Sequence, residues 1–411
     1  MNTATTYPAM RWIVLLAGGI ACLAGNMYMI SFASILTDIA KDLNIDIGRA
    51  THFMSMFMLS GSIAIIVGGM LCDRFGILFV LTLSALFASG GALLMPLMGH
   101  QYSTALVARV FEGMGTGFAF SLMSPIMAIW FPPKEQGIAA GLLGMAVALG
   151  AVISYPLSTG IFEATGNWQV MSAWISIVGW VGLVLTIILI TTPKPTLPSQ
   201  ARAEASSSSG DALRQQLAEP MTWICTLVVF FAAWQLQTIF NITPTYLAAD
   251  TPLGLGLGYM TASKLMLMAS IAGAFAPIVS GILQDKVFKT NARAFMFIGY
   301  ALCCIFMYLL LLPVITGSNA FLLVCIILAA TGIAVLYAAL PLFVSLNYPL
   351  QVIGKVFGII FGLGGFGGAV GLFAAGAAVN AKGNYHLAVT LISLSALVGF
   401  IMVFFLKRWR T

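Results

Sequence analysis

The sequence predicts an all-α membrane protein with twelve transmembrane helices arranged as two six-helix halves. Three observations support this fold class: the chain is unusually apolar, its apolar residues form long runs, and the runs divide into two equal sets. Of the 411 residues, 60% are hydrophobic and only 7% are charged, whereas a soluble domain carries about 25% charged residues. This composition excludes an ordinary soluble globular protein, and the high hydrophobicity excludes a disordered chain.

Each predicted helix is a run long enough to cross the hydrocarbon core of a bilayer, which takes about 20 apolar residues. The runs end at turn-forming pairs such as Pro132-Pro133, Gly166-Asn167 and Gly383-Asn384. They are too long, and alternate too little, to be strands of a transmembrane barrel. The twelve predicted spans are 12–38, 49–71, 77–98, 103–130, 137–163, 168–191, 221–249, 259–283, 293–315, 319–346, 352–379 and 385–406.

A polar segment separates the first six spans from the last six. Residues 193–220 are rich in proline, serine and alanine and show no apolar periodicity until Leu213, so we expect a linker with a short surface helix near its end. The predicted organisation is a six-helix bundle in residues 1–191, a cytoplasmic linker in 192–219 and a second six-helix bundle in 220–411. Two halves with equal numbers of spans indicate an internal duplication.

The basic residues predict the orientation of the chain in the membrane. With the N-terminus inside, thirteen lysines and arginines fall on the inner side and three on the outer side. The positive-inside rule therefore places both termini and the linker in the cytoplasm. The net charge of +6 reflects this topology, so we expect no nucleic-acid partner. The compact tails favour a bacterial inner membrane.

A short motif recurs at the same place in each half. The loop after the second span reads GGMLCDRFG and the loop after the eighth reads GILQDKVFK, so Asp73 and Asp285 lie 212 residues apart in matching contexts. Asp73, Arg74, Asp285 and Lys286 can cap helices or form ion pairs between the two halves. Because such contacts can form in one transport state and break in another, we expect these four residues to act as a cytoplasmic gate.

This layout resembles the major facilitator superfamily over essentially the whole chain. The resemblance rests on the two sets of six spans, on the paired loop motif and on RVFEGMGTG in the fourth span, where Arg109, Gly113 and Gly115 match the family pattern Arg-x-x-x-Gly-x-Gly. It implies a secondary transporter that works by alternating access, with spans 1, 4, 7 and 10 lining a central cavity. Signatures of drug antiporters, sugar porters, peptide carriers and nitrate carriers are absent, so no subfamily is assigned.

Three charged residues lie within the predicted spans, where an unpaired charge is costly. Arg109 and Glu112 are three residues apart and share one helix face, and Lys264 lies near the outer end of the eighth span. In one interpretation Glu112 carries the coupling proton, Arg109 tunes it, and Arg109 and Lys264 bind an anionic substrate. In the other, Arg109 and Glu112 form a structural ion pair and Lys264 reaches the membrane surface.

Uncharged polar residues within the spans are further candidates for substrate binding. Asn26 and Tyr28 interrupt the first span, Gln237 and Asn241 lie four residues apart on the seventh, and Tyr337 interrupts the tenth. Each could equally form a hydrogen bond between helices, which contributes about 1 kcal/mol or less.

The sequence contains no motif for a metal, a nucleotide or a catalytic triad, and its six cysteines form no CxxC or Cys/His cluster. We therefore expect no cofactor and no enzymatic activity. The predicted function is uptake of a small organic anion, such as a carboxylate, with protons as coupling ion, by a monomer in the lipid bilayer. The alternative is a carrier or exporter of a neutral or zwitterionic nutrient, such as an amino acid. A receptor would need an output domain for which the linker and tails leave no room, and a channel would need a repeated filter segment.

Overall fold

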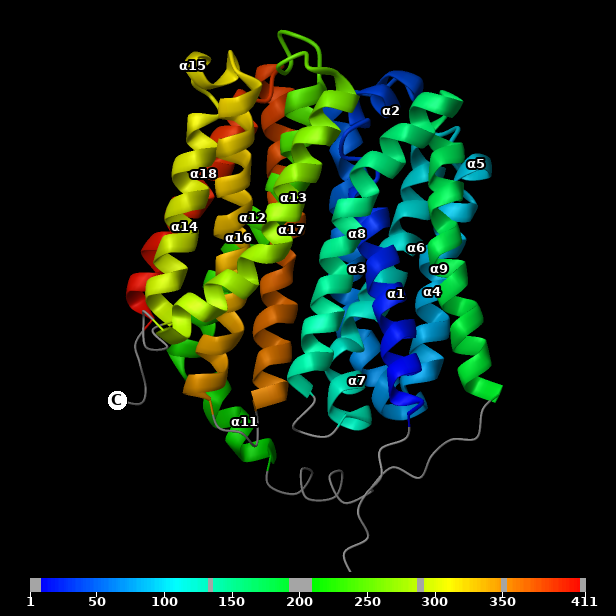
Figure 1. The fold of residues 1–411 in the computed structure, drawn as a ribbon, viewed down its shortest axis with the longest axis vertical. Helices are drawn as coiled ribbons and strands as arrows, with labels where there is room; N and C mark the ends of the chain where they lie inside the picture. Colours follow the sequence, from blue (N-terminus) through cyan, green and yellow to red (C-terminus); the bar gives the residue numbers. More distant parts are fainter. Residues whose placement is uncertain (1–8, 132–135, 192–208, 287–291, 349–352, 407–411) are drawn as a thin grey trace, which may run out of the picture.

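The computed structural model describes residues 9–131, 136–191, 209–286, 292–348 and 353–406. Over these residues the chain is almost entirely α-helical and has no strand. Figure 1 shows the long helices standing side by side in two bundles, the first coloured blue to green and the second green to red. Ten of the described helices are long and apolar enough to cross a membrane, and α4 is a shorter apolar helix. The predicted fold class is confirmed.

The helices follow the predicted spans closely. The first half contains α1 (Arg11–Ile30), α2 (Leu36–Asp42), α3 (Ile47–Phe75), α4 (Ile77–Leu93), α5 (Met95–Met98), α6 (Tyr102–Ser121), α7 (Met123–Trp130), α8 (Gln136–Thr165) and α9 (Trp168–Thr191). The second half contains α12 (Pro220–Ala248), α13 (Gly258–Lys286), α14 (Ala292–Leu309), α15 (Pro313–Thr316), α16 (Asn319–Asn347), α17 (Ile353–Lys382) and α18 (His386–Phe405). Helix α11 (Ser209–Ala218) is the short helix expected near the end of the linker.

Four spans predicted as single helices, 12–38, 77–98, 103–130 and 293–315, are each divided in two, and in this respect the prediction was wrong. Proline explains three of the breaks: α4, α6 and α14 end three or four residues before Pro96, Pro125 and Pro313. Proline has no N–H to donate to the carbonyl four residues earlier, so the helical hydrogen-bond ladder stops there. The fourth break, at residues 31–35, contains no proline and has a different cause, described below.

The two ends of the molecule are distinct. We call the end that carries α7 and α11 the linker end, and the opposite end, with α2, α5 and α15, the far end (Figure 1). Between them the two halves meet where α3 packs on α17 and α8 packs on α13. Among the described residues, the hydrogen bonds that cross this seam all lie toward the far end; they join Ala33, Ser34, Lys41, Gly48 and Tyr155 to Thr245, Ser263, Asp250, Asn380 and Phe240. The seam is therefore closed at the far end.

Candidate functional site

Arg109 and Glu112 form an ion pair in the interior of the first half. Both side chains come from one face of α6, and Arg109 Nη1 donates to Glu112 Oε2. The side chains are 0% and 1% exposed, so the pair is fully removed from lipid and water. The three-residue spacing that predicts a shared helix face thus brings the two charges into contact.

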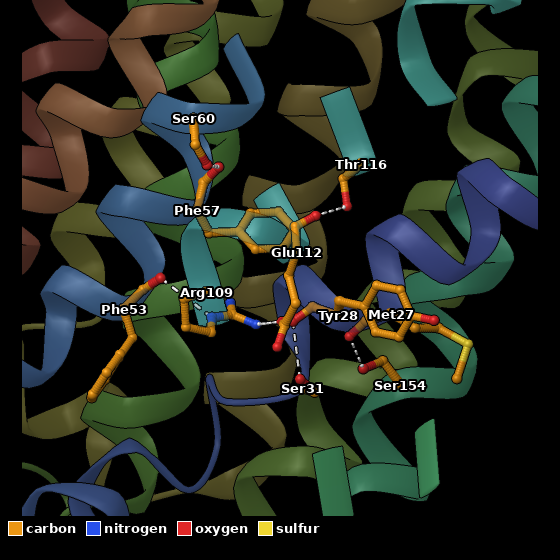
Figure 2. Close-up of polar contacts among 10 residues, drawn as sticks. All are labelled: Met27, Tyr28, Ser31, Phe53, Phe57, Ser60, Arg109, Glu112, Thr116 and Ser154. Atoms are coloured by element: carbon orange, nitrogen blue, oxygen red, sulfur yellow. Dashed lines mark hydrogen bonds and ion pairs between the residues drawn. The ribbon is translucent and has the colours of Figure 1, made fainter. Parts of the chain in front are cut away.

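The guanidinium of Arg109 is held from three sides. Its Nη1 also donates to the Tyr28 carbonyl at 2.9 Å, and its Nε donates to the Phe53 carbonyl at 3.3 Å. The cation lies 4.4 Å from the ring centroid of Phe32 and 4.6 Å from that of Phe57, distances at which aromatic faces attract a cation. Figure 2 shows the guanidinium lying between α3 and the end of α1.

These contacts explain the break after α1 that contains no proline. The last carbonyls of a helix lack helical partners and carry partial negative charge. The Tyr28 carbonyl accepts from Arg109 and from Ser31 Oγ at 2.9 Å. The Met27 carbonyl accepts from the Ser31 N–H at 3.0 Å and, in addition, from Ser154 Oγ at 2.9 Å. Arg109 of α6 therefore caps the end of α1 and places its positive charge where the helix end is negative, and Ser154 of α8 adds a second contact there.

The glycines after Glu112 set how closely α6 approaches its neighbours. A Cβ atom on Gly113 would overlap the Phe57 carbonyl of α3, and one on Gly115 would overlap the backbone of α4 at Ala88. Backbone contact on both sides needs residues without side chains. The spacing of Arg109, Gly113 and Gly115 thus has a physical explanation: because the glycines let α6 pack closely, Arg109 reaches the carbonyls of α1 and α3.

The ion pair leaves two buried polar atoms without partners. Among the described residues, Arg109 Nη2 and Glu112 Oε1 make no hydrogen bond. Most buried polar groups in proteins are hydrogen-bonded, and exceptions call for an explanation. An unpartnered carboxylate oxygen can accept a proton without any protein hydrogen bond being broken.

The other two candidates of the first half form hydrogen bonds between helices. Asn26 Nδ2 donates to the Val147 carbonyl of α8 at 2.7 Å. The Tyr28 hydroxyl lies 2.9 Å from Ser89 Oγ and donates to the Ser176 carbonyl at 3.3 Å. These contacts join α1 to α4, α8 and α9, so both side chains contribute to the packing of this half.

In the second half, Gln237 and Asn241 form a buried polar pair on α12. Asn241 Nδ2 donates to the Gln237 carbonyl at 2.8 Å and to its Oε1 at 3.2 Å. Asn241 Oδ1 is buried and has no partner among the described residues. Tyr337 lies partly buried on α16. The structure therefore brings Gln237 and Asn241 together and leaves one acceptor atom unused.

Lys264 stands apart from the buried charges. It is exposed near the far end of α13, whereas Arg109 is enclosed by α1, α3 and α6. The two cations do not meet in one site.

Three of the four residues predicted to form the gate have side chains outside the described part of the structure: Asp73, Asp285 and Lys286. Arg74 is exposed in the last turn of α3 and lies over the ring of Phe75 at 5.1 Å. The gate stays a prediction.

Sequence reasoning missed the small hydroxyl residues that join the two halves. Thr245 Oγ1 donates to the Ala33 carbonyl at 2.6 Å, and Ser34 Oγ lies 3.2 Å from Ser263 Oγ. Serine and threonine are common in apolar helices, so their identity alone gives no signal. Prolines within spans would have been a better guide, because they mark carbonyls that need an outside donor.

Comparison with known proteins identifies the family. Residues 16–372 match the family model described as Major Facilitator Superfamily. The chain is 26% identical to the hexuronate transporter of Bacillus subtilis over 62% of its own length and 60% of that protein. It is 28% identical to the 3-(3-hydroxy-phenyl)propionate transporter of Escherichia coli over 68% of its length and 66% of that protein. Both matches span less than two thirds of the relative's length.

Two further similarities cover more of the chain. A probable sulfoacetate transporter of Cupriavidus necator is 26% identical over 78% of this chain and 76% of that protein. A solved bacterial homolog of the human lysosomal transporter Spinster, in an inward-facing and occupied conformation, superposes with a TM-score of 0.74 over 98% of both chains at 15% identity. This likeness supports the fold. Because the family model matches most of its length, the chain belongs to the Major Facilitator Superfamily and is an integral membrane protein.

Proposed function

We propose that this transporter takes up a small organic anion, such as a carboxylate, together with protons across a bacterial inner membrane. The observation that carries the proposal is the buried carboxylate of Glu112, paired with one arginine and left with an unpartnered oxygen. The relatives named above are a hexuronate transporter, a 3-(3-hydroxy-phenyl)propionate transporter and a probable sulfoacetate transporter, and each of these named solutes is an organic acid. These names support an anionic cargo.

Proton and anion binding would favour each other in this arrangement. A proton on Glu112 removes the negative charge that balances Arg109, which leaves a buried cation for an anion to compensate. Coupling between two binding events is reciprocal, so a bound anion in turn favours the protonated carboxyl. This relation is what symport of an acid with protons requires.

We assign substrate contact to Arg109, Lys264, Asn26, Tyr28, Gln237, Asn241 and Tyr337. Asn241 has the strongest geometric support, because its free Oδ1 can accept a hydrogen bond from a substrate hydroxyl. We further propose that the linker end, with both termini, faces the cytoplasm, that Asp73, Arg74, Asp285 and Lys286 form the gate there, and that the protein works as a monomer. Alkaline phosphatase fused after residue 406 would stay inactive in this orientation.

One observation favours a second candidate function, transport of a neutral or zwitterionic nutrient. Arg109 is already engaged by Glu112, two carbonyls and two rings, and Lys264 is exposed. If these charges serve only the packing of the protein, the substrate needs no net charge.

A ligand screen separates the two functions. Thermal unfolding of the detergent-purified protein is followed with glucuronate, 3-phenylpropionate, sulfoacetate, alanine, glucose and uridine at pH 5.5 and pH 7.5, where a bound substrate raises stability by mass action. Stabilisation by one of the acids, greater at pH 5.5, is the expected result. Stabilisation by alanine, glucose or uridine alone would replace the first function by the second.

A further inference from the structure

Pro244, inside α12, leaves one backbone carbonyl without its helical donor. In a continuous helix the carbonyl of Phe240 accepts from the N–H of residue 244, and proline has none. An unsatisfied carbonyl inside a membrane protein is costly, so another donor is needed.

That donor comes from the opposite half of the molecule. The hydroxyl of Tyr155, on α8, donates to the Phe240 carbonyl at 2.6 Å. Tyr155 is fully buried, and the contact crosses the seam between the halves near the far end. A second hydrogen bond is donated from the second half to the first: Ser263 Oγ on α13 donates to the Tyr155 carbonyl at 2.9 Å.

We propose that these two hydrogen bonds, together called the Tyr155 clasp, form a gate that holds the far end closed and breaks when the far end opens. The phenol oxygen and the serine hydroxyl each act across the seam, so separation of α8 from α12 and α13 must break both. The carbonyl of Phe240 loses its tyrosine donor when the halves separate and regains it when they close again. This preference for the closed seam does not depend on which solute is carried.

The position of the clasp fits this role. Thr245 Oγ1, one turn beyond Phe240 on α12, donates to the Ala33 carbonyl at 2.6 Å, and Ser263 Oγ also lies 3.2 Å from Ser34 Oγ. The clasp is therefore anchored next to the break that follows α1. Each of these contacts joins the two halves, whereas the Arg109 contacts lie within one half.

Distance measurement between spin labels tests the clasp. Labels are attached to Thr165→Cys and Asn319→Cys, at the far end of each half where residues 165 and 319 are exposed. The parent chain without these two substitutions, labelled in the same way, gives the signal that the native cysteines contribute. Tyr155→Phe removes the hydroxyl and keeps the ring. We expect the ratio of long to short label distances to rise about threefold to tenfold, the range given by loss of one inter-helix hydrogen bond.

A matched control separates gating from general loss of a buried hydroxyl. Tyr300 is also fully buried and donates to the Val228 carbonyl, but both residues lie in the second half. Tyr300→Phe should leave the label distances unchanged. Equal shifts in Tyr155→Phe and Tyr300→Phe, or no shift in Tyr155→Phe, would overturn the proposal.

A second pair of variants tests the role of Pro244. Pro244→Ala restores an N–H that can occupy the Phe240 carbonyl, so Tyr155→Phe should change the distance ratio less in the Pro244→Ala background than in the parent. An undiminished effect would contradict the assignment of Pro244. If Pro244→Ala does not fold, Ser263→Ala, which removes the reciprocal bond, should shift the ratio in the same direction as Tyr155→Phe, and no shift would count against the clasp.

Discussion

Arg109 donates a hydrogen bond to the carbonyl oxygen of Tyr28, two residues before α1 ends. The arginine is therefore at once the partner of Glu112 and the cap of a helix end. This double use ties the charge state of Glu112 to the geometry of α1, the helix whose following turn, at Ala33 and Ser34, contacts the other half. Only a few contacts therefore separate the proposed protonation site, Glu112, from the seam between the halves.

Replacing Arg109 should destabilise the protein strongly. Arg109→Met leaves the Glu112 carboxylate buried and unpaired, which costs about 3–5 kcal/mol when one partner of a buried pair is removed. The double variant Arg109→Met with Glu112→Leu should recover much of this loss. Chemical or thermal unfolding in detergent measures both, and a double variant no more stable than the single one would show that the ion pair itself contributes little.

Replacing Gly113 should disrupt the packing of α6. Gly113→Ala places a Cβ on the Phe57 carbonyl, a backbone atom that cannot move aside without displacing α3, so we expect reduced folded yield. Gly160→Ala on α8 is the matched control, because a Cβ there meets nothing within 4 Å and alanine favours a helix over glycine by about 1 kcal/mol. Equal folded yields from the two variants, measured by gel filtration, would contradict the proposed close approach.

Asp46 at the far end should make stability depend on acid pH. Its partial burial opposes ionisation, but the hydrogen bonds from the Arg49 N–H and Asn380 and the charge of Arg49 outweigh this, so the pKa of Asp46 is lowered. A lowered folded-state pKa contributes stability above the unfolded value of about 3.9, and this stability is lost as pH falls through the folded value. Asp46→Asn keeps a helix-capping oxygen and does not titrate.

We therefore expect acidification below about pH 4 to destabilise the parent more than Asp46→Asn. Thermal unfolding between pH 3 and pH 6 gives the comparison. Parallel pH profiles for the two proteins would show that Asp46 does not contribute.

Asn241→Ala should weaken substrate binding with little change in folding. We expect about a tenfold loss of affinity for whichever of glucuronate, 3-phenylpropionate or sulfoacetate stabilises the parent, as for one hydrogen bond of about 1.4 kcal/mol. Gln235→Ala on the same helix is the control, because Gln235 donates to the Ile392 carbonyl at 2.8 Å and to Ser395 Oγ at 2.6 Å on α18. Gln235→Ala should lower stability and spare affinity; the reverse pattern would exclude Asn241 from the site.

The sequence predicts the helices well because length and apolarity are local properties. The pairing of Arg109 with Glu112 also follows from spacing on one helix. The breaks before Pro96, Pro125 and Pro313 could have been predicted from the missing N–H, but runs counted by hydropathy continue through them. The break at residues 31–35 could not, because it depends on Arg109, a donor far away in the chain.

The candidate site was harder to predict than the fold. Whether Lys264 faces the interior or the surroundings depends on how α13 is rotated in its bundle, which packing decides and composition does not. Gln237 and Asn241 could be paired by their four-residue spacing, whereas the unused Oδ1 of Asn241 emerges only when every neighbour is in place. The partner of Tyr155 lies 85 residues away, beyond the reach of any local pattern.

The role of Glu112 as the proton carrier is tested most directly in proteoliposomes with the acid that stabilises the purified protein. Glu112→Gln keeps the size and hydrogen-bonding groups of the side chain but cannot exchange a proton, and Glu163→Gln makes the same change at an exposed carboxylate. With Glu112→Gln, we expect exchange of labelled for unlabelled acid to continue while accumulation driven by a pH gradient is lost; with Glu163→Gln, both should continue. Gradient-driven accumulation that survives in Glu112→Gln would contradict proton transfer at this residue.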